Sequence, residues 1–558
     1  MRQIDIWCLW TLLLSSATVC SAQAPLIAYR GILNAASQMP GGAPGGAIAR
    51  GSTFTIAGRN LGPDSTPDLS DPLQTTLGNV SIAVTQGTTT VNAIPLSLSA
   101  SSVTAIMPSN APVGMASVRV TYKNVRSNPM PVQIVAAQFG IYTSNGAGSG
   151  PGMIANDNGD GTTTPNTLQT PGIPGQTVYL SGTGLGAIAT DTALMPSPAN
   201  LTVKTEVFVG GVAAAVSTNG RTAPGVDRIG FMIPAGAPLG CWTPVYVRTA
   251  GTAVSNFATI ALSVDGTPCQ EPNNFLASAL INGGNIGSYA VARINVRHDA
   301  AARTVRDSTT DLLGAYEAQE VAGPANFNPL FSLPPAGSCT AYTIVGDLIG
   351  DPITVLAGMT PPTGMALDNG GGAVLQGNKG KSLTQTGPYP GLSAIQLGAT
   401  APGLPLTQRP YLDAGGLTLL TTGGKDIGAS STDIQVPAPF IWSNRDQTLN
   451  IARSKGLNIT WTGGDSASSV FIAAASVDLP SNSTAVALCL VPPGSTSFAV
   501  PADVLANFPA TRIRAIQSRG VVYVGQWNLA SPAAVSATGL DFGALLAVFI
   551  GGKTVNFQ

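Results

Sequence analysis

An internal repeat dominates the first half of the sequence. The stretch that begins at Gly51 reads GSTFTIAGRNLG, and the stretch that begins at Gly175 reads GQTVYLSGTGLG. Two further landmarks recur in the same order, MPSNAPVG with IPAGAPLG, and Ser127-Asn128 with Ser255-Asn256. The copies lie about 125 residues apart, which is the size of an ordinary domain. The repeat therefore predicts two tandem domains, at 25–136 and 137–266.

Each copy carries the side-chain period of a β-strand. Phe54 and Ile56 alternate with more polar neighbours, and Val178 and Leu180 do the same in the second copy. A period of two places one face of a strand in a core and the other in solvent. Glycine and proline, at 66 and 43 residues, interrupt helices and favour turns. We therefore predict an all-β chain of tandem β-sandwich domains, followed by further β-rich sandwich units.

Several motifs resemble a known family. The GILNAAS opening at Gly31, the GxxLG turn, the APxG element and the Ser-Asn pair resemble the immunoglobulin-like, IPT/TIG-type domain pairs of secreted acidobacterial (Solibacter-type) proteins. The resemblance covers about residues 28–265. Later segments that begin at Pro334, Tyr411 and Leu457, and the terminal GKTVNFQ, also resemble such proteins. It implies immunoglobulin-like sandwiches and export, and it supplies no catalytic residue.

The second half shows no further copy of the repeat. We expect a β-rich domain at 267–437 and a β-sandwich domain at 438–558, and the sequence leaves open whether these are one domain or two. Gly551-Gly552 is predicted as the turn of a terminal hairpin. Trp461 lies in an alternating strand, which favours a core position; an exposed sugar-stacking role is the alternative.

The N-terminus has the features of a secretory signal peptide, predicted at 1–24. Arg2 precedes a short apolar run, and Ala22-Gln23-Ala24 fits a cleavage site. The apolar run is shorter than the ~20 residues that a membrane-spanning helix needs. No later run is long enough either. We expect a secreted or cell-surface protein without a membrane span after the signal is removed.

Four cysteines remain beyond the signal peptide, and in an exported chain they predict two disulfides. Three connectivities are possible. Cys241 with Cys269 is preferred because both flank one predicted β-unit, which leaves Cys339 with Cys489. The chain has a single histidine and no C-x-x-C motif, so the cysteines do not form a zinc pattern.

One segment is a weak calcium candidate. In NDNGDG, the residues Asn156, Asn158 and Asp160 fall at ligand positions of an EF-type loop. Thr167 stands where such a loop requires a bidentate glutamate. A β-turn is therefore the favoured interpretation, and no other metal site and no cofactor are predicted.

Charge is scarce, at 9% of residues with a net charge of -1, and no basic stripe suits nucleic acid. It concentrates in one segment, in which His298 is interpreted as a solvated strand end. The segment favours a solvated outer face with cross-strand ion pairs; a polar binding surface or an inter-domain contact is the alternative. Its charged residues are Arg293, Arg297, Asp299, Arg303, Arg306, Asp307, Asp311, Glu317 and Glu320.

The sequence contains no arrangement of catalytic groups that we recognise, so no catalytic residue is predicted. We expect a non-catalytic binding, adhesion or spacer protein whose candidate partners are an extracellular polysaccharide or another surface protein. A polysaccharide-binding protein is the first alternative. A hydrolase is the second, and a pocket that joined Asp311, Glu317 and another carboxylate would favour it.

Overall fold

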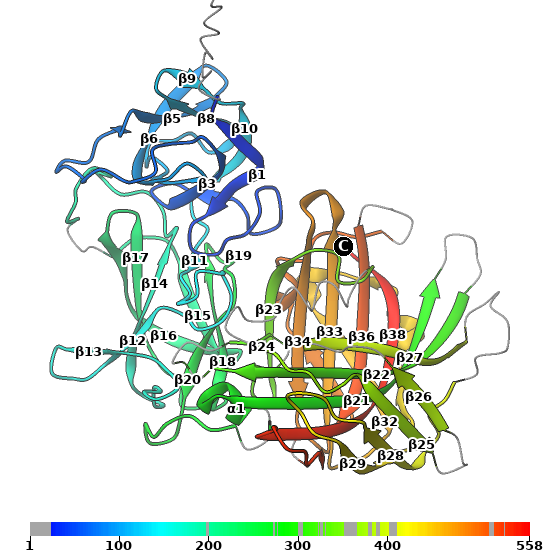
Figure 1. Ribbon diagram of the computed structural model, residues 1–558. Coiled ribbons are helices and arrows are strands. Elements are labelled where there is room, and N and C mark those ends of the chain that lie inside the picture. Colours follow the sequence, from blue (N-terminus) through cyan, green and yellow to red (C-terminus); the bar gives the residue numbers. More distant parts are fainter. Residues whose placement is uncertain are drawn as a thin grey trace, which may run out of the picture.

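The computed structural model describes residues 24–196, 200–271, 274–275, 277–299, 305–321, 323, 327–329, 331–350, 365–377, 382–386, 391–400, 410–512, 518–528 and 531–558. Strands make up nearly all regular structure in these ranges, which confirms the all-β class. Residues 1–23 of the predicted signal peptide lie outside the described ranges. Three β-structured bodies follow one another along the chain (Figure 1). None of the helices in these ranges has the length and apolar character that crossing a bilayer requires.

The first body is a sandwich in which one continuous strand path folds over its own core. β6 pairs with β5 along its first half and with β7 along its second half. A register shift in the β6–β7 pairing lies in the half that pairs with β7. Phe54, Ile56, Val118 and Val120 are all fully buried between the two halves. Its strands are β1 (Leu26–Asn34), β2 (Ile48–Ala49), β3 (Thr53–Arg59), β4 (Thr76–Leu77), β5 (Val80–Gln86), β6 (Thr89–Leu98), β7 (Ser102–Ile106), β8 (Gly114–Tyr122), β9 (Val125–Arg126) and β10 (Met130–Val135).

The second body repeats this topology. The order β3-β7-β6-β5-β8-β10 in the first corresponds to β14-β17-β16-β15-β18-β20 in the second, and β1 corresponds to β11 and β12 together. The sequence repeat is therefore a repeat of the fold. The strands are β11 (Gly140–Ile141), β12 (Ile154–Asp157), β13 (Thr163–Pro165), β14 (Thr177–Thr183), β15 (Thr205–Val209), β16 (Val212–Ala223), β17 (Val226–Met232), β18 (Gly240–Thr249), β19 (Ala253–Val254) and β20 (Ala258–Leu262).

The Ser-Asn landmark has the same structural role in both sandwiches. The amide of Asn128 accepts a hydrogen bond from Ile27 N (2.8 Å) and donates one to Ile27 O (3.1 Å). Asn256 makes the same two bonds with Ile141, at 2.8 and 3.0 Å. Each asparagine thus holds the chain at the start of its sandwich to the segment that leads into the last strand.

The third body is larger, and one large hydrophobic core joins most of its strands, with smaller clusters beside it. Buried residues from most of its strands pack together, and Tyr246, Val254 and Phe257 of the second sandwich join them. Its elements are α1 (Ala277–Asn282), β21 (Gly284–Asp299), β22 (Val305–Glu320), β23 (Ser338–Val345), β24 (Met365–Ala366), β25 (Gly372–Gly377), β26 (Ser382–Thr386), β27 (Gly391–Thr400), β28 (Gly415–Thr421), β29 (Ser430–Val436), β30 (Phe440–Trp442), η1 (Arg445–Gln447), β31 (Asn450–Ile451), η2 (Arg453–Lys455), β32 (Leu457–Gly463), β33 (Ser469–Asp478), η3 (Leu479–Ser481), β34 (Ser483–Val491), β35 (Ser497–Val500), α3 (Ala502–Leu505), β36 (Ser518–Trp527), β37 (Ala533–Ala534) and β38 (Phe542–Phe557).

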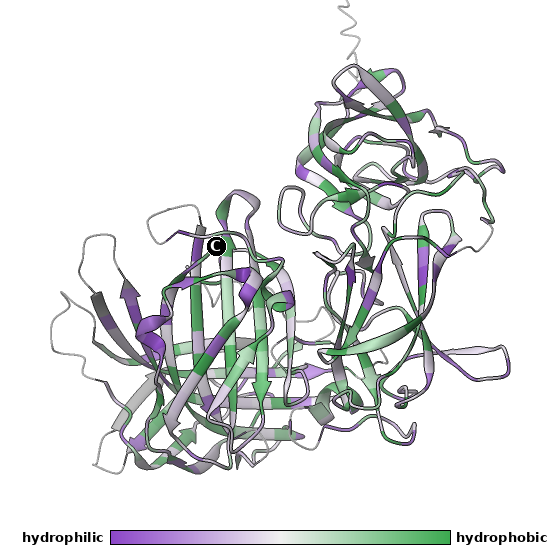
Figure 2. Ribbon diagram, turned by 180° about the vertical axis from the view of Figure 1, so that it is seen from behind, coloured by the Kyte–Doolittle hydropathy of each residue, from purple (hydrophilic) through white to green (hydrophobic). Residues whose placement is uncertain are grey.

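Strands from the two ends of this body pair with each other. β21 runs parallel to β38, and β23 pairs antiparallel with β34. Both pairs cross the expected boundary between 437 and 438, which therefore marks no break in the hydrogen bonding. Along the strands, hydrophobic segments alternate with white or hydrophilic ones (Figure 2), as expected for strands with one buried face.

The predicted terminal hairpin is wrong. β38 continues through Gly551-Gly552 as one strand, because it has β21 on one side and β36 on the other. A side chain at Gly552 would come within 2.8 Å of the Tyr523 ring and 3.0 Å of Val296. The glycines therefore allow neighbouring side chains to pack closely against the β38 backbone, and they do not form a turn.

Two disulfides are present, as the sequence predicts. Cys241 bonds with Cys269 where the second sandwich ends, and Cys339 bonds with Cys489 across β23 and β34. The two bonds close sequence separations of 28 and 150 residues. The longer loop spans most of the third body, so this bond ties distant parts of the chain together.

Polar contacts join the third body to both sandwiches. Arg30 of β1 forms an ion pair with Asp478 at 2.9 Å. Asp503 of α3 accepts from Arg248 and from the Tyr246 hydroxyl, each at 3.1 Å. These contacts, together with the shared core, hold the three bodies in one arrangement (Figure 1).

Candidate functional site

The charged segment forms two long paired strands, β21 and β22. Arg293 and Asp311 lie directly opposite each other, and the guanidinium donates two hydrogen bonds of 2.8 Å to the carboxylate. Asp311 is fully buried and also accepts from the Leu412 backbone at 2.7 Å. Bidentate pairs of this kind fix geometry as well as charge. The pair anchors the chain that leads into β28.

The two glutamates of the segment are also buried. Glu317 accepts from the hydroxyl of Tyr289 at 2.6 Å and from the amide of Asn369. Its second carboxyl oxygen is buried without a partner among the described residues, and burial raises the pKa of Glu317 to about 7. Glu320 accepts from the Tyr316 hydroxyl at 2.7 Å.

These carboxylates do not converge. Asp311 and Glu317 share a strand face but stand six residues apart, which is roughly 20 Å along an extended strand. Glu320 lies on the opposite face of the same strand. The expected ion pair is present, but the expectation of a solvated face is wrong for all three side chains, which are buried. Asn369 and Leu412 pack over one face of β22. Asn328 and Phe331 pack over the other. These segments lie far from the covered residues in the sequence or in loops, so the side-chain period does not reveal that both faces are covered.

The exposed end of the segment makes other ion pairs. Arg297 contacts Asp446 at 2.8 Å, and Asp307 contacts Arg445 at 3.4 Å. His298 is exposed, and its Nε2 lies 3.0 Å from the Ser308 hydroxyl. The side chains of Asp299, Arg303 and Arg306 lie outside the described residues.

The calcium candidates lie at the hairpin between β12 and β13. Asn156 is buried, and its side-chain oxygen accepts from Asn166 at 3.1 Å. Asn158 bonds Thr162 and Thr164, while Asp160 accepts from the backbone and hydroxyl of Thr162. All three candidate side chains are thus engaged in hydrogen bonds within the chain. In the described part of the chain, no three His, Cys, Asp or Glu side chains gather as metal ligands would.

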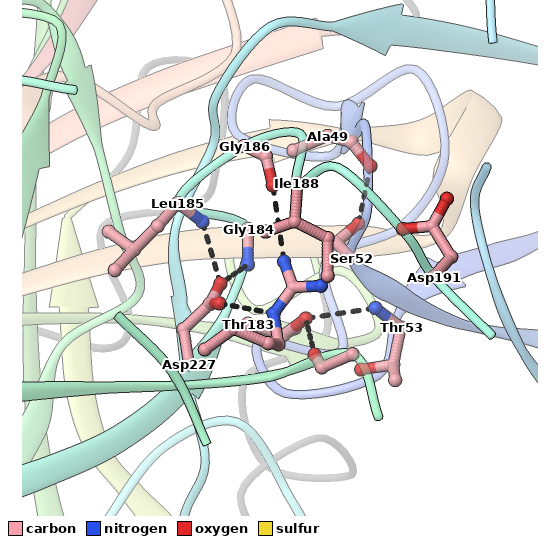
Figure 3. Close-up of polar contacts among 12 residues, drawn as sticks. Ala49, Ser52, Thr53, Thr183, Gly184, Leu185, Gly186, Ile188, Asp191 and Asp227 are labelled. Carbon is pink, nitrogen blue, oxygen red and sulfur yellow. Dashed lines mark hydrogen bonds and ion pairs between the residues drawn. The ribbon is translucent and has the colours of Figure 1, made fainter. Parts of the chain in front are cut away.

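A buried ion pair lies where the two sandwiches meet (Figure 3). Arg221 Nε lies 2.6 Å from Asp227, and the two side chains are 2% and 0% exposed. The second Asp227 oxygen accepts from the backbone of Gly184 and of Leu185, each at 2.8 Å.

The turn held by Asp227 reaches the first sandwich. Thr183 directly precedes Gly184 in this turn, and its hydroxyl accepts a hydrogen bond from Thr53 N at 2.8 Å. The Thr53 hydroxyl in turn lies 2.6 Å from the Tyr142 hydroxyl. The Gly-Thr-Gly-Leu-Gly turn is therefore a structural joint between the two sandwiches.

A cavity of about 440 Å³ opens in the third body, and we call it the Trp527 cavity. Trp527 ends β36, and its ring packs on Phe471 with centroids 4.5 Å apart. A turn at Asp465 forms one wall, and Gln526 fixes that turn by accepting from Asp465 N at 2.8 Å. The lining residues are Asp433, Ile434, Gln435, Pro437, Ala438, Phe440, Asp465, Ser468, Gln526, Trp527, Asn528, Ser531, Pro532, Ala533, Leu545, Leu546, Ala547 and Phe549.

The aromatic residue that the sequence singled out is a core residue. Trp461 is 4% exposed and packs near Phe440, with ring centroids 6.1 Å apart. Sequence reasoning assigned no site to Trp527. A tryptophan where an alternating strand meets a polar loop is the signal that could have found it.

No protein-family model matches the chain, and no curated protein is significantly similar to it. Among solved structures, the tetra-tandem repeat of the extending region of a large adhesion protein is 14% identical, with a TM-score of 0.13 over 90% of this chain and 95% of that chain. SGBP-B from a Bacteroides uniformis xyloglucan utilization locus is 12% identical, with a TM-score of 0.16 over 86% and 96%. TM-scores this low carry no argument about fold or function.

Proposed function

We propose that this protein is an exported, non-catalytic binding or adhesion module. The observation that carries the proposal is that the three buried carboxylates of β22 are each held by hydrogen bonds to separate partners. Asp311 accepts hydrogen bonds from Arg293. Glu317 accepts from Tyr289 and Asn369, and Glu320 accepts from Tyr316. Groups held in separate buried pairs stabilise a frame, whereas general acid-base chemistry needs them together beside a substrate.

Export and the IPT/TIG character of the two sandwiches are part of this proposal. Two disulfides support export, because such bonds persist in oxidising compartments. The signal-like N-terminus supports it independently. We propose 25–136 and 137–266 as the first two domains, and we treat 267–558 as a single unit because β21 pairs with β38.

The test is a comparison of binding with turnover. The purified full chain is applied to immobilised polysaccharides and to intact cells of the producing organism, and the same polysaccharides are assayed for released reducing ends. We expect saturable binding to one of these surfaces without turnover. Release of product that Glu317→Gln abolishes while the fold is kept would overturn the proposal.

A further inference from the structure

We propose that the Trp527 cavity binds an electrically neutral saccharide. This inference rests on the proposed binding function and names the ligand class and the site. At about 440 Å³, the cavity has the volume of small-molecule sites in proteins. Its lining consists of the Trp527 indole, a floor of apolar side chains and several side chains that can form hydrogen bonds. A sugar ring offers the matching surfaces, with C–H groups on its faces and hydroxyls around its edge.

The aromatic part of the cavity is held in place before any ligand arrives. Trp527 pairs with Ser469 at the end of β36 and packs on Phe471. Phe440 and Phe549 are 8% and 6% exposed and contribute to the floor. A rigid aromatic ring provides contact area at low cost in conformational entropy. A C–H face of a sugar can therefore stack there without rearrangement of the cavity.

The polar part offers both donors and acceptors. Asp433 is exposed, and Gln435 and Asn528 provide amide groups that donate as well as accept. Asp465 is fixed because its oxygens accept from Ala467 N (3.0 Å) and the Ser468 hydroxyl (2.8 Å). Sugar hydroxyls also donate and accept, so they suit this mixture. A cationic amine only donates, and it would leave the amide N–H groups unused.

Charge decides against acidic sugars. Among the described residues that line the cavity, Asp433 and Asp465 are the only ionisable side chains. A uronate or sulfate group would lie beside two carboxylates with no basic side chain in the wall. The negative charge of that group and those of Asp433 and Asp465 would repel one another inside the cavity. The cavity therefore favours neutral sugars over acidic ones.

The experiment uses the full chain and isothermal titration calorimetry. The probes are neutral gluco-, manno-, galacto- and xylo-oligosaccharides, oligogalacturonate as the acidic probe and a lysine oligopeptide as the cationic probe. The variants are Trp527→Ala and Asp433→Ala. Matched controls on the first sandwich are Tyr29→Ala, an aromatic that is 72% exposed, and Asp68→Ala, an exposed carboxylate. Thermal unfolding of each variant verifies the fold.

We expect binding of at least one neutral probe, weakened roughly tenfold or more by Trp527→Ala. Asp433→Ala should also weaken it, and the two controls should leave it unchanged. Because Asp433 is exposed, its variant keeps the test valid if Trp527→Ala unfolds.

Three results would overturn the inference while the proposed function stands. They are neutral-sugar binding that both variants retain, preference for the acidic or cationic probe, and binding to cells without binding of any neutral sugar. Absence of binding to every probe and surface would overturn both proposals.

Discussion

At the scale of single residues, identical side chains have different roles because their surroundings differ. Asp433 faces a cavity, whereas Asp311 is fully buried against Arg293. Asp227 is also buried, and it satisfies one guanidinium and two backbone N–H groups. A buried charge must be paired, because removal from water destabilises it. The stability of this protein therefore depends strongly on a few ionisable residues.

Asp227→Ala should destabilise the joint between the sandwiches by roughly 3–5 kcal/mol, because Arg221 would keep an uncompensated buried charge. Replacing both residues by leucine should cost less than the single change. Lys204→Ala is the control, since Lys204 is 68% exposed and its pair with Glu206 contributes little. Denaturant unfolding of the three variants measures the difference, and equal losses would contradict the expectation.

Glu317 should make stability depend on pH. Its folded pKa of about 7 lies above the usual unfolded value near 4.3. The folded state therefore binds the proton more tightly, so its stabilising effect is complete below pH ~4.3 and is lost as pH rises toward 7. Glu317→Gln should reduce this loss, which is at most about 4 kcal/mol.

Melting temperatures of the parent protein and of Glu317→Gln between pH 4 and 8 test this expectation. Glu271, whose pKa burial also raises to about 7, provides a second variant, Glu271→Gln. Parallel pH profiles for the parent protein and Glu317→Gln would show that Glu317 does not titrate in this range.

At the scale of elements, the two sandwiches hold their first segment in place with equivalent hydrogen bonds. In each, a serine hydroxyl accepts from a backbone N–H of the long strand, Val120 or Val247. The next residue, Asn128 or Asn256, then bonds both backbone groups of one residue near the start. The Ser-Asn repeat is explained by this hydrogen bonding.

Asn256→Ala should destabilise the second sandwich by about 1–3 kcal/mol, because the backbone groups of Ile141 lose their partner. Asn128→Ala is the matched change in the first sandwich. Its effect should be smaller, because Asn256 is more buried and has a third bond, to Gly148 O at 2.8 Å. Hydrogen exchange should accelerate locally at Ile141 in one variant and at Ile27 in the other. Unchanged exchange would contradict this role.

At the scale of the whole molecule, distant segments of the chain close the third body. β21 and β38 pair although most of the body's sequence lies between them. The Cys339–Cys489 bond closes a separation of 150 residues and the Cys241–Cys269 bond one of 28. Crosslinks that close long loops remove more entropy from the unfolded chain. The longer crosslink should therefore contribute more to stability.

Replacing Cys339 and Cys489 by alanine should destabilise the protein by roughly 1.5 kcal/mol more than the same change at Cys241 and Cys269, from the difference in loop closure. Each double variant leaves the other bond intact and serves as the control for it. Denaturant unfolding under non-reducing conditions measures both. A larger loss for the shorter loop would show that local packing outweighs chain entropy.

The amino-acid sequence by itself determined the local features of this protein. Side-chain period identified strands such as β3 and β14, and repeated landmarks identified two similar sandwiches. These features depend on neighbours in sequence, so they can be read from it. The sequence preferred one cysteine pairing among three open connectivities, and the tertiary structure contains that pairing.

Only the tertiary structure decided which strand faces are covered and which strands are neighbours. The residues of β22 show no alternation that marks a buried face, and Glu317 is buried because distant segments pack over it. Gly551 continues a strand because β21 and β36 flank it, and Trp527 borders a cavity because β29 and β38 approach it. Such contacts join residues far apart in the chain, where local patterns carry no information.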